Sequence, residues 1–278
     1  MNLATLTKDI HSAPTAPSGF VRRIGSLARA EALLLRRNPM ALINALAIPV
    51  AMVVFLVTVE AGDSAGGSGR GPAVVTTLTA VSLLAVVYMG LVTALVARRE
   101  ELVLKRLRTG ELYDAEIIAG TAAPAVAVAW GQMLVGVLAA FTVFGMGLPT
   151  NPVLVLVAIV LGTAVFVLFA VVTTAVTRTV EMAQVTATPG YAVPVLFSGL
   201  LFPLDLLPEP LQRVAPLMPM TPVVDLMHLG LTGRTPDGDT VGLGASFAPA
   251  AGPVLVLVAW VVVAGWAARR WFRWEPRR

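Results

Sequence analysis

Six long stretches of this sequence contain no Asp, Glu, Lys or Arg. A bilayer core of about 30 Å is crossed by a helix of about 20 apolar residues, and each stretch reaches that length. One charged side chain at the centre of such a helix costs about 2.5–3.5 kcal/mol on insertion. The pattern predicts an all-α integral membrane protein with six transmembrane helices, at about residues 40–59, 73–97, 117–148, 152–177, 182–202 and 247–268.

Composition supports this class of protein. The chain is 57% hydrophobic and 13% charged, a balance that a soluble domain cannot keep in solution. The turn Leu148-Pro-Thr-Asn-Pro152 divides an apolar run that is too long for one span. The absence of cysteine excludes a disulfide scaffold, a thiolate metal site and a cysteine nucleophile.

The basic residues predict the orientation. The N-terminal segment, the loop 98–116, Arg178 and the C-terminal tail hold 17 of the 20 Lys and Arg residues. The other three, Arg70, Arg213 and Arg234, lie in the opposite loops. Because loops rich in Lys and Arg stay inside, both termini are expected in the cytoplasm, with the chain crossing the cell (plasma) membrane several times.

The N-terminal region is expected to lie on the membrane without crossing it. Residues 1–18 are polar and are interpreted as a disordered cytoplasmic tail, and residues 39–278 as the six-span domain. Between them, residues 19–38 predict an amphipathic helix at the interface. The alternative is a simple positive flank of the first span. The helix would place Phe20, Ile24, Leu27 and Leu34 opposite Arg22, Arg29 and Arg36.

The loop after the fifth span is unusual. Residues 203–233 are largely apolar but contain six prolines and four charged residues. Prolines at that density exclude one long straight helix. Short helical pieces that re-enter the outer side of the membrane, packed against protein, fit better.

The sequence lacks the chemistry of most enzymes. It has no GxxxxGK[ST] phosphate loop, and its two histidines, His11 and His228, form no metal-binding cluster. The predicted spans hold no carboxylate that would carry a proton relay. We therefore expect no catalysis, no metal and no cofactor in this chain, and no nucleic-acid partner. Any transport must take its energy from another protein.

One short charged segment stands out between the second and third spans. As a helix, residues 98–108 would place Val103, Leu104 and Leu107 on one face, with Glu101 and Lys105 paired at i,i+4. Such a pattern favours a docking helix. The alternative is a solvated linker whose charges only fix the topology.

This segment resembles a known family. Residues 97–120, ARREELVLKRLRTGELYDAEIIAG, are similar to the loop between the second and third spans of ABC type 2 permeases, the membrane subunits of ABC exporters of the drug-efflux type. A second stretch, residues 199–227, resembles the family's proline-rich signature after the fifth span. Two departures are Thr109-Gly110-Glu111, where Thr-Pro-Leu is usual, and Thr121, where a lysine is common. The matching positions in the first stretch are Arg99, Glu100, Leu104, Leu107, Tyr113, Glu116, Ile117, Ile118 and Gly120.

The resemblance implies that residues 98–108 form the coupling helix, seated in a groove of a separate ATP-binding subunit. Two such subunits, which bind ATP and Mg, would serve two permeases, either two copies of this chain or one copy with a related permease. Glu100 would pair with an arginine of the ATPase. The implied coupling residues are Arg99, Glu100, Glu101, Leu104, Lys105, Arg106 and Leu107.

The substrate path is expected along the second and fifth spans, which frame the central cavity in related exporters. The predicted path residues are Thr79, Ser82, Val86, Tyr88, Met89, Thr93, Thr186, Tyr191, Phe197 and Ser198. The alternative for these hydroxyls is a bond to their own helix backbone or to a neighbouring helix. An apolar outer gate is expected at Leu200, Leu201 and Phe202.

Together these patterns predict a permease subunit that moves an amphipathic drug or natural product outward by alternating access. The uncharged path favours an amphipathic or apolar small molecule. A lipid or polysaccharide permease is the nearest alternative. A membrane anchor or sensor partner that transports nothing is the alternative from another class.

Overall fold

The computed structural model describes Ala51 and residues 70–102, 113–200, 203–235 and 238–272. The predicted tail, the interfacial helix and nearly all of the first predicted span lie outside these residues. The described part consists of helices and turns, without a β-strand, as expected for an all-α membrane protein.

Four helical segments are long and apolar enough to cross a membrane. They lie where the sequence predicts the second, third, fourth and sixth spans. The first of them, 31 residues long, is made of three consecutive elements without a break. The segments are α3 (Arg70–Val81) with η4 (Ser82–Met89) and α4 (Gly90–Glu100), then α6 (Asp114–Thr142), α7 (Pro152–Val176) and α11 (Phe247–Trp271).

The α6 helix ends at Thr142, earlier than the apolar run predicts. Gly145 adopts a left-handed conformation with φ of 61°, and the Met146 N–H bonds the Ala140 carbonyl oxygen at 2.9 Å. This glycine-terminated arrangement satisfies the last carbonyls of the helix and turns the chain away. Hydropathy extended the predicted span to Leu148 because it does not register such a turn.

The fifth predicted span is a shorter helix, α8 (Val180–Leu196). Its 17 residues give a length of about 25 Å, somewhat less than the bilayer core. Two prolines, Pro189 and Pro194, lie inside it, and Gly199 follows with φ of 74°. The helix therefore stops before Phe202, the expected end.

The proline-rich segment forms short helices, as its composition predicts. They are η5 (Leu204–Leu206), α9 (Glu209–Val214), η6 (Ala215–Leu217) and α10 (Thr221–Thr232), and α10 is bent by 73° from the two helices before it. Val223 of α10 lies beside Gly162 of α7, about ten residues and about 15 Å along α7 from its first turn. Gly230 of α10 lies against Asn151, at the start of α7. The α10 helix thus runs from mid-depth of the bundle to its end.

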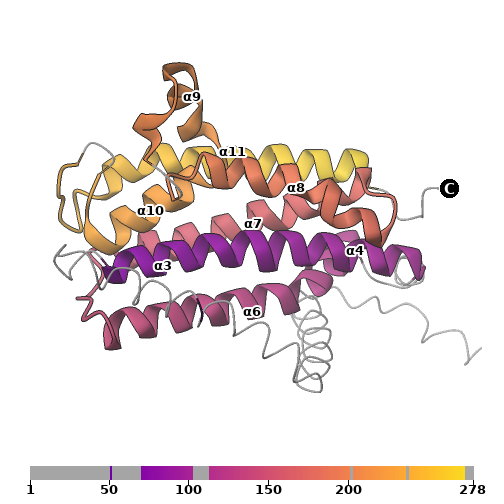
Figure 1. Cartoon of the computed structure of the whole chain (residues 1–278), viewed down its shortest axis with the longest axis horizontal. Coiled ribbons are helices and arrows are strands. Elements are labelled where there is room, and N and C mark those ends of the chain that lie inside the picture. Colours follow the sequence, from indigo (N-terminus) through magenta and orange to yellow (C-terminus); the bar gives the residue numbers. More distant parts are fainter. Residues whose placement is uncertain (1–50, 52–69, 103–112, 201–202, 236–237, 273–278) are drawn as a thin grey trace, which may run out of the picture.

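The helices form a layered bundle with their long axes side by side (Figure 1). The α6 helix packs on α3 and η4, and α7 packs on η4, α10 and α11. A chain of edge-to-face aromatic contacts, with centroids 6.5, 6.0 and 5.2 Å apart, crosses the core. It runs from Tyr88 through Phe166 and Phe169 to Trp260, and so joins the second, fourth and sixth predicted spans.

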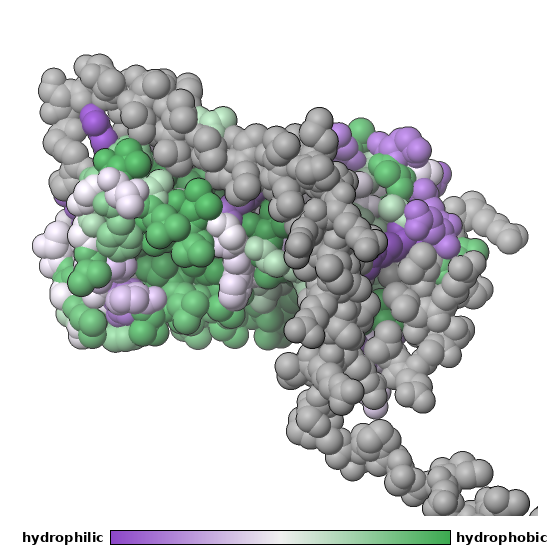
Figure 2. Space-filling model, turned by 90° about the horizontal axis from the view of Figure 1, so that it is seen from below, coloured by the Kyte–Doolittle hydropathy of each residue, from purple (hydrophilic) through white to green (hydrophobic). Residues whose placement is uncertain are grey.

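The exterior of the bundle is apolar, as a lipid-facing surface must be. Exposed large side chains include Leu134 on α6, Leu156 on α7 and Val262 on α11. Figure 2 shows a broad hydrophobic surface on the part of one face that lies away from the end where α4 stops, and hydrophilic residues gathered at that end. This end, called the α4 end below, also holds the start of α6 and the C-terminal end of α11 (Figure 1).

Candidate coupling and transport site

Three consecutive residues at the end of α4, Arg98, Arg99 and Glu100, contact three different helices. We call them the clamp. Arg98 Nη1 donates to Thr121 Oγ1 of α6 at 3.0 Å. Arg99 reaches the end of α7, and Glu100 reaches the start of α8. The clamp therefore joins the second span to the third, fourth and fifth.

Arg99 caps the end of α7. Its side chain is fully buried, and its guanidinium donates to the carbonyl oxygens of Thr174 at 2.8 Å, of Thr177, and of Arg178 at 3.4 Å. The last carbonyls of a helix have no partner within the helix, and the helix dipole makes that end negative. A buried cation with several donors in a fixed fork meets both requirements.

Glu100 caps the opposite kind of helix end, the start of α8. Its Oε1 accepts the backbone N–H of Val180, the first residue of α8, at 3.2 Å. A carboxylate is favourable at the positive end of a helix. The charge pair Arg-Glu thus matches the negative end of α7 and the positive end of α8, which are joined by a short turn.

These contacts differ from those expected for a docking helix over residues 98–108. The α4 helix stops at Glu100, a turn follows at Glu101, and Leu102 has a left-handed φ of 58°. Arg98, Arg99 and Glu100 therefore belong to the spanning helix, and their side chains contact the neighbouring spans. The remaining predicted coupling residues, Leu104, Lys105, Arg106 and Leu107, lie outside the described residues.

A cavity of about 730 Å³ lies next to the clamp, between η4, α7, α8 and the end of α11. We call it the α8 cavity. Its lining is apolar and hydroxyl-bearing, with one charged side chain, although the sequence analysis expected an uncharged path. The lining residues are Tyr88, Val172, Thr173, Ala175, Val176, Thr186, Gly190, Arg270, Trp271 and Phe272.

Two polar contacts hold α8 beside α7 at this cavity. The Tyr88 hydroxyl lies 3.0 Å from Thr173 Oγ1 and donates to the Ala187 carbonyl oxygen at 3.2 Å. The Thr177 and Thr186 hydroxyls are 2.7 Å apart. Since Arg99 binds the Thr177 carbonyl, a continuous series of contacts leads from the clamp to the cavity wall.

The predicted path residues of the second span do not share one environment. Thr79 and Ser82 are buried, and Ser82 donates to Gln132 of α6 at 2.8 Å. Thr93 is exposed and donates to its own Met89 carbonyl. The sequence analysis assumed one α-helical face, but η4 is a π-helix, whose wider turn rotates the following residues to another side. Val86 and Met89 are half-buried against the core, and Tyr88 alone of these six lines the α8 cavity.

In the fifth span, Thr186 lines the cavity, and the other predicted residues lie further along the chain. Tyr191 packs against the core, and Ser198 is buried and donates to the Val195 carbonyl. The Phe197 carbonyl accepts the Thr221 hydroxyl of α10 at 2.6 Å. Of the predicted gate, Leu200 is half-buried against the core, and Leu201 and Phe202 lie outside the described residues.

The cavity has the features of a small-molecule binding site, with few polar groups among apolar walls. Within the described ranges, no three His, Asp or Glu side chains gather to hold a metal ion. A comparison with curated proteins finds no match. The model of the family described as "ABC-2 type transporter" matches residues 22–231.

The chain belongs to the ABC-2 type transporter family. It is therefore a membrane-spanning permease subunit of an ABC transporter, and its family implies association with an ABC ATP-binding subunit. The match includes the clamp and most of the α8 cavity. It stops before α11, which supplies Arg270, Trp271 and Phe272 to the cavity.

Sequence reasoning missed several functional candidates in this ABC-2 permease. Thr173 and Thr177 lie in a run of apolar residues, where nothing distinguishes a hydroxyl that joins two spans from one that bonds its own helix. Arg270 was counted only as a topological charge. One signal was available for the clamp. An Arg-Glu pair at the end of a span, with a short turn between two later spans, matches the two opposite helix ends there.

Proposed function

We propose that this permease forms the membrane part of an ATP-driven exporter that moves an amphipathic drug or natural product out of the cell. The observation that carries the proposal is the clamp, which ties the end of α4 to α7 and α8 next to the α8 cavity. A movement imposed on the segment after α4 would be passed through the clamp to α8, one wall of that cavity.

The cavity favours this substrate class. Apolar walls with a few hydroxyls suit the apolar body of an amphipathic molecule, and Arg270 at the α4 end suits an acceptor or acidic group on it. Polymers need a long polar path, and the half-buried Val86 and Met89 beside Tyr88 offer none. An amphipathic small molecule is therefore preferred over a polysaccharide.

Alternating access follows from differential binding. ATP closes the partner ATPase dimer, and the closed dimer must favour one arrangement of the spans over the other. The segment after Glu100 would seat in the ATPase, with Leu104, Lys105, Arg106 and Leu107 on its surface. Arg99 would act from inside the permease. Glu101 is exposed beside the clamp and is suited to the ATPase contact.

The arrangement in the membrane completes the proposal. Arg98, Arg99, Arg178, Arg269 and Arg270 belong to helix ends at the α4 end, which favours the cytoplasmic side for that end and for both termini. Two permeases, as two copies or as this chain with a related one, would work in the plasma membrane with two ATPase subunits that hold ATP and Mg.

The test is co-reconstitution with the cognate ATPase in vesicles and measurement of dye export per ATP hydrolysed, with a fluorescent amphipathic dye as the probe. Glu100→Arg places a cation at the positive end of α8, so we expect export per ATP to fall by about tenfold while the ATPase stays bound. Glu100→Gln keeps an acceptor for the Val180 N–H and should retain most of the export.

Normal export per ATP by the Glu100→Arg variant would remove the clamp from the coupling route. Movement of the dye without ATP would overturn the proposal. Transport of lipid or polysaccharide by the unaltered complex, without transport of the dye, would overturn the proposed substrate class. If the ATPase binds but the complex transports neither dye, lipid nor polysaccharide, the result would favour a membrane anchor or sensor partner.

A further inference from the structure

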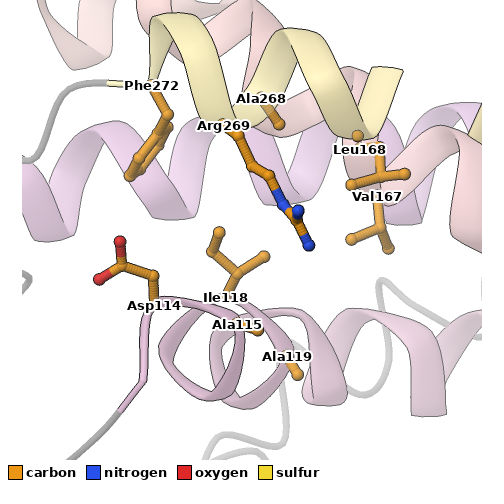
Figure 3. Close-up of a pocket in the computed structure, with 10 residues that line it drawn as sticks. Asp114, Ala115, Ile118, Ala119, Val167, Leu168, Ala268, Arg269 and Phe272 are labelled. Carbon is orange, nitrogen blue, oxygen red and sulfur yellow. The ribbon is translucent and has the colours of Figure 1, made fainter. Parts of the chain in front are cut away.

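A second groove lies at the α4 end of the bundle, next to the α8 cavity. It runs between the first turns of α6, the middle of α7 and the last turns of α11, with a volume of about 360 Å³ (Figure 3). It shares Phe272 with the α8 cavity. The two arginines before Phe272 differ, because Arg269 lines the groove and Arg270 lines the cavity. The two hollows therefore have distinct linings.

The floor and walls of the groove are apolar. Val167 and Leu168 of α7 form part of the lining, with Ile118 of α6. Small residues keep the space open, because a Cβ added at Gly265 would meet only Leu168 Cδ1, at 3.9 Å. Since α6 touches α7 little and packs mainly on α3 and η4, the groove follows a gap between α6 and α7. Such a space suits a hydrocarbon chain.

The groove also carries one charge of each sign. Asp114, the first residue of α6, and Arg269, in the last turn of α11, extend toward the groove from opposite helices (Figure 3). Both residues lie where their helices reach the end of the bundle. This is the level of lipid headgroups when the adjoining helices span the hydrocarbon core.

We propose that the groove binds a phospholipid with an ammonium headgroup, of the phosphatidylethanolamine type. The lipid phosphate would bind the Arg269 guanidinium, the ammonium would lie at Asp114, and one acyl chain would follow Val167 and Leu168. An ammonium group has three N–H donors for a carboxylate, whereas a choline group has none. An anionic lipid would meet the charge of Asp114 unfavourably.

The test is native mass spectrometry of the purified full-length permease, after incubation with phosphatidylethanolamine, phosphatidylcholine or phosphatidylglycerol of identical acyl chains. We expect one phosphatidylethanolamine to be retained preferentially. Arg269→Gln should lower its retention by about fivefold, the effect of one headgroup charge contact. Arg213→Gln removes an exposed arginine of α9 that lines neither hollow, and should leave retention unchanged.

A second pair of variants tests the acyl site. Gly265→Leu should fill the groove and abolish retention, whereas Gly252→Leu, on the same helix with open space around it, should not. Size-exclusion profiles establish that both variants stay folded. Equal retention of the three lipids, or loss in both leucine variants, would overturn the proposal.

A segment of the chain itself is the competing occupant. The predicted amphipathic helix at residues 19–38 carries the right apolar and basic residues for the same groove. The chain has no cysteine, so the paired substitutions Ile24→Cys and Ala119→Cys report on this directly. Efficient cross-linking in membranes would overturn the lipid assignment, and absence of the cross-link together with lipid retention would support it.

Discussion

The two helices beside the α8 cavity, α7 and α8, are anchored very differently. The α7 helix has 25 residues, its one proline lies at its first position, and it packs on α4, α8, α10, α11 and η4. The α8 helix has 17 residues, two internal prolines, and neighbours in α4, α7 and η4. Both ends of α7 are held by residues from other parts of the chain. Ser246 bonds Asn151, the N-cap of α7, and Arg99 bonds the carbonyls at its last turn.

This difference identifies which wall of the cavity is suited to move. A helix with satisfied ends and neighbours on several sides is a fixed support, and α7 fits that description. A shorter helix with internal prolines has fewer backbone bonds to lose when it bends. The α8 helix is therefore the wall better suited to move, and the clamp ties it to the rest of the bundle at the α4 end.

The largest effect is expected from removing the cap of α7. Arg99→Ala leaves buried carbonyls without their charged donor, and should lower the free energy of unfolding by at least about 3 kcal/mol. Arg99→Lys keeps the charge but loses the several donors of the guanidinium, and should recover part of the lost free energy of unfolding. Thermal unfolding in detergent measures this. A small loss for Arg99→Ala, similar to that of Arg98→Ala, would mean that α7 is not anchored by this residue.

A smaller effect is expected where Gly190 of α8 packs against Tyr88 of the second span. A Cβ at Gly190 would clash with the Tyr88 hydroxyl, so Gly190→Ala must push α8 outward. The cost is about 1–3 kcal/mol, typical of overpacking. Tyr88→Leu in the same chain removes the clash and should restore much of the stability. If the double variant is no more stable than Gly190→Ala alone, the close packing of α8 on η4 is not what destabilises Gly190→Ala.

How far the sequence predicts this fold depends on the kind of signal. Apolar runs and prolines correctly indicated the helices around residues 73–97, 117–148, 152–177 and 247–268 and the short helices after α8. Turns formed by one glycine, at Gly145 and Gly199, shortened α6 and α8 and are invisible to hydropathy.

The smallest effects compare the two N-caps. Asn151 Oδ1 accepts the N–H groups of Val153 and Leu154 while its amide donates to Ser246 at 2.9 Å. Thr179 accepts from Met182 at 3.4 Å at an exposed position. Asn151→Ala should cost about 1–2 kcal/mol and Thr179→Ala about 0.5 kcal/mol. Equal costs in the same unfolding assay would contradict the unequal anchoring of α7 and α8.

The candidate site was predicted less completely than the fold. The family resemblance drew attention to Arg99 and Glu100, but the expected partner was an ATPase, and the contacts found are with helix ends of the same chain. The cavity residues of the second span were assigned with an α-helical period. A π-helix places Tyr88 toward α8 and Ser82 toward Gln132, and its wider turn follows from packing that no local pattern reveals.

The cap on α7 also has a consequence for biosynthesis. Arg99 is made before α7, so the ribosome delivers the donor well before its acceptors. Until the fourth span arrives, the guanidinium must stay at the membrane surface, where water and lipid phosphates solvate it. The burial of Arg99 therefore marks the moment at which the second and fourth spans come together, and a reporter of its accessibility to water would date that step during insertion.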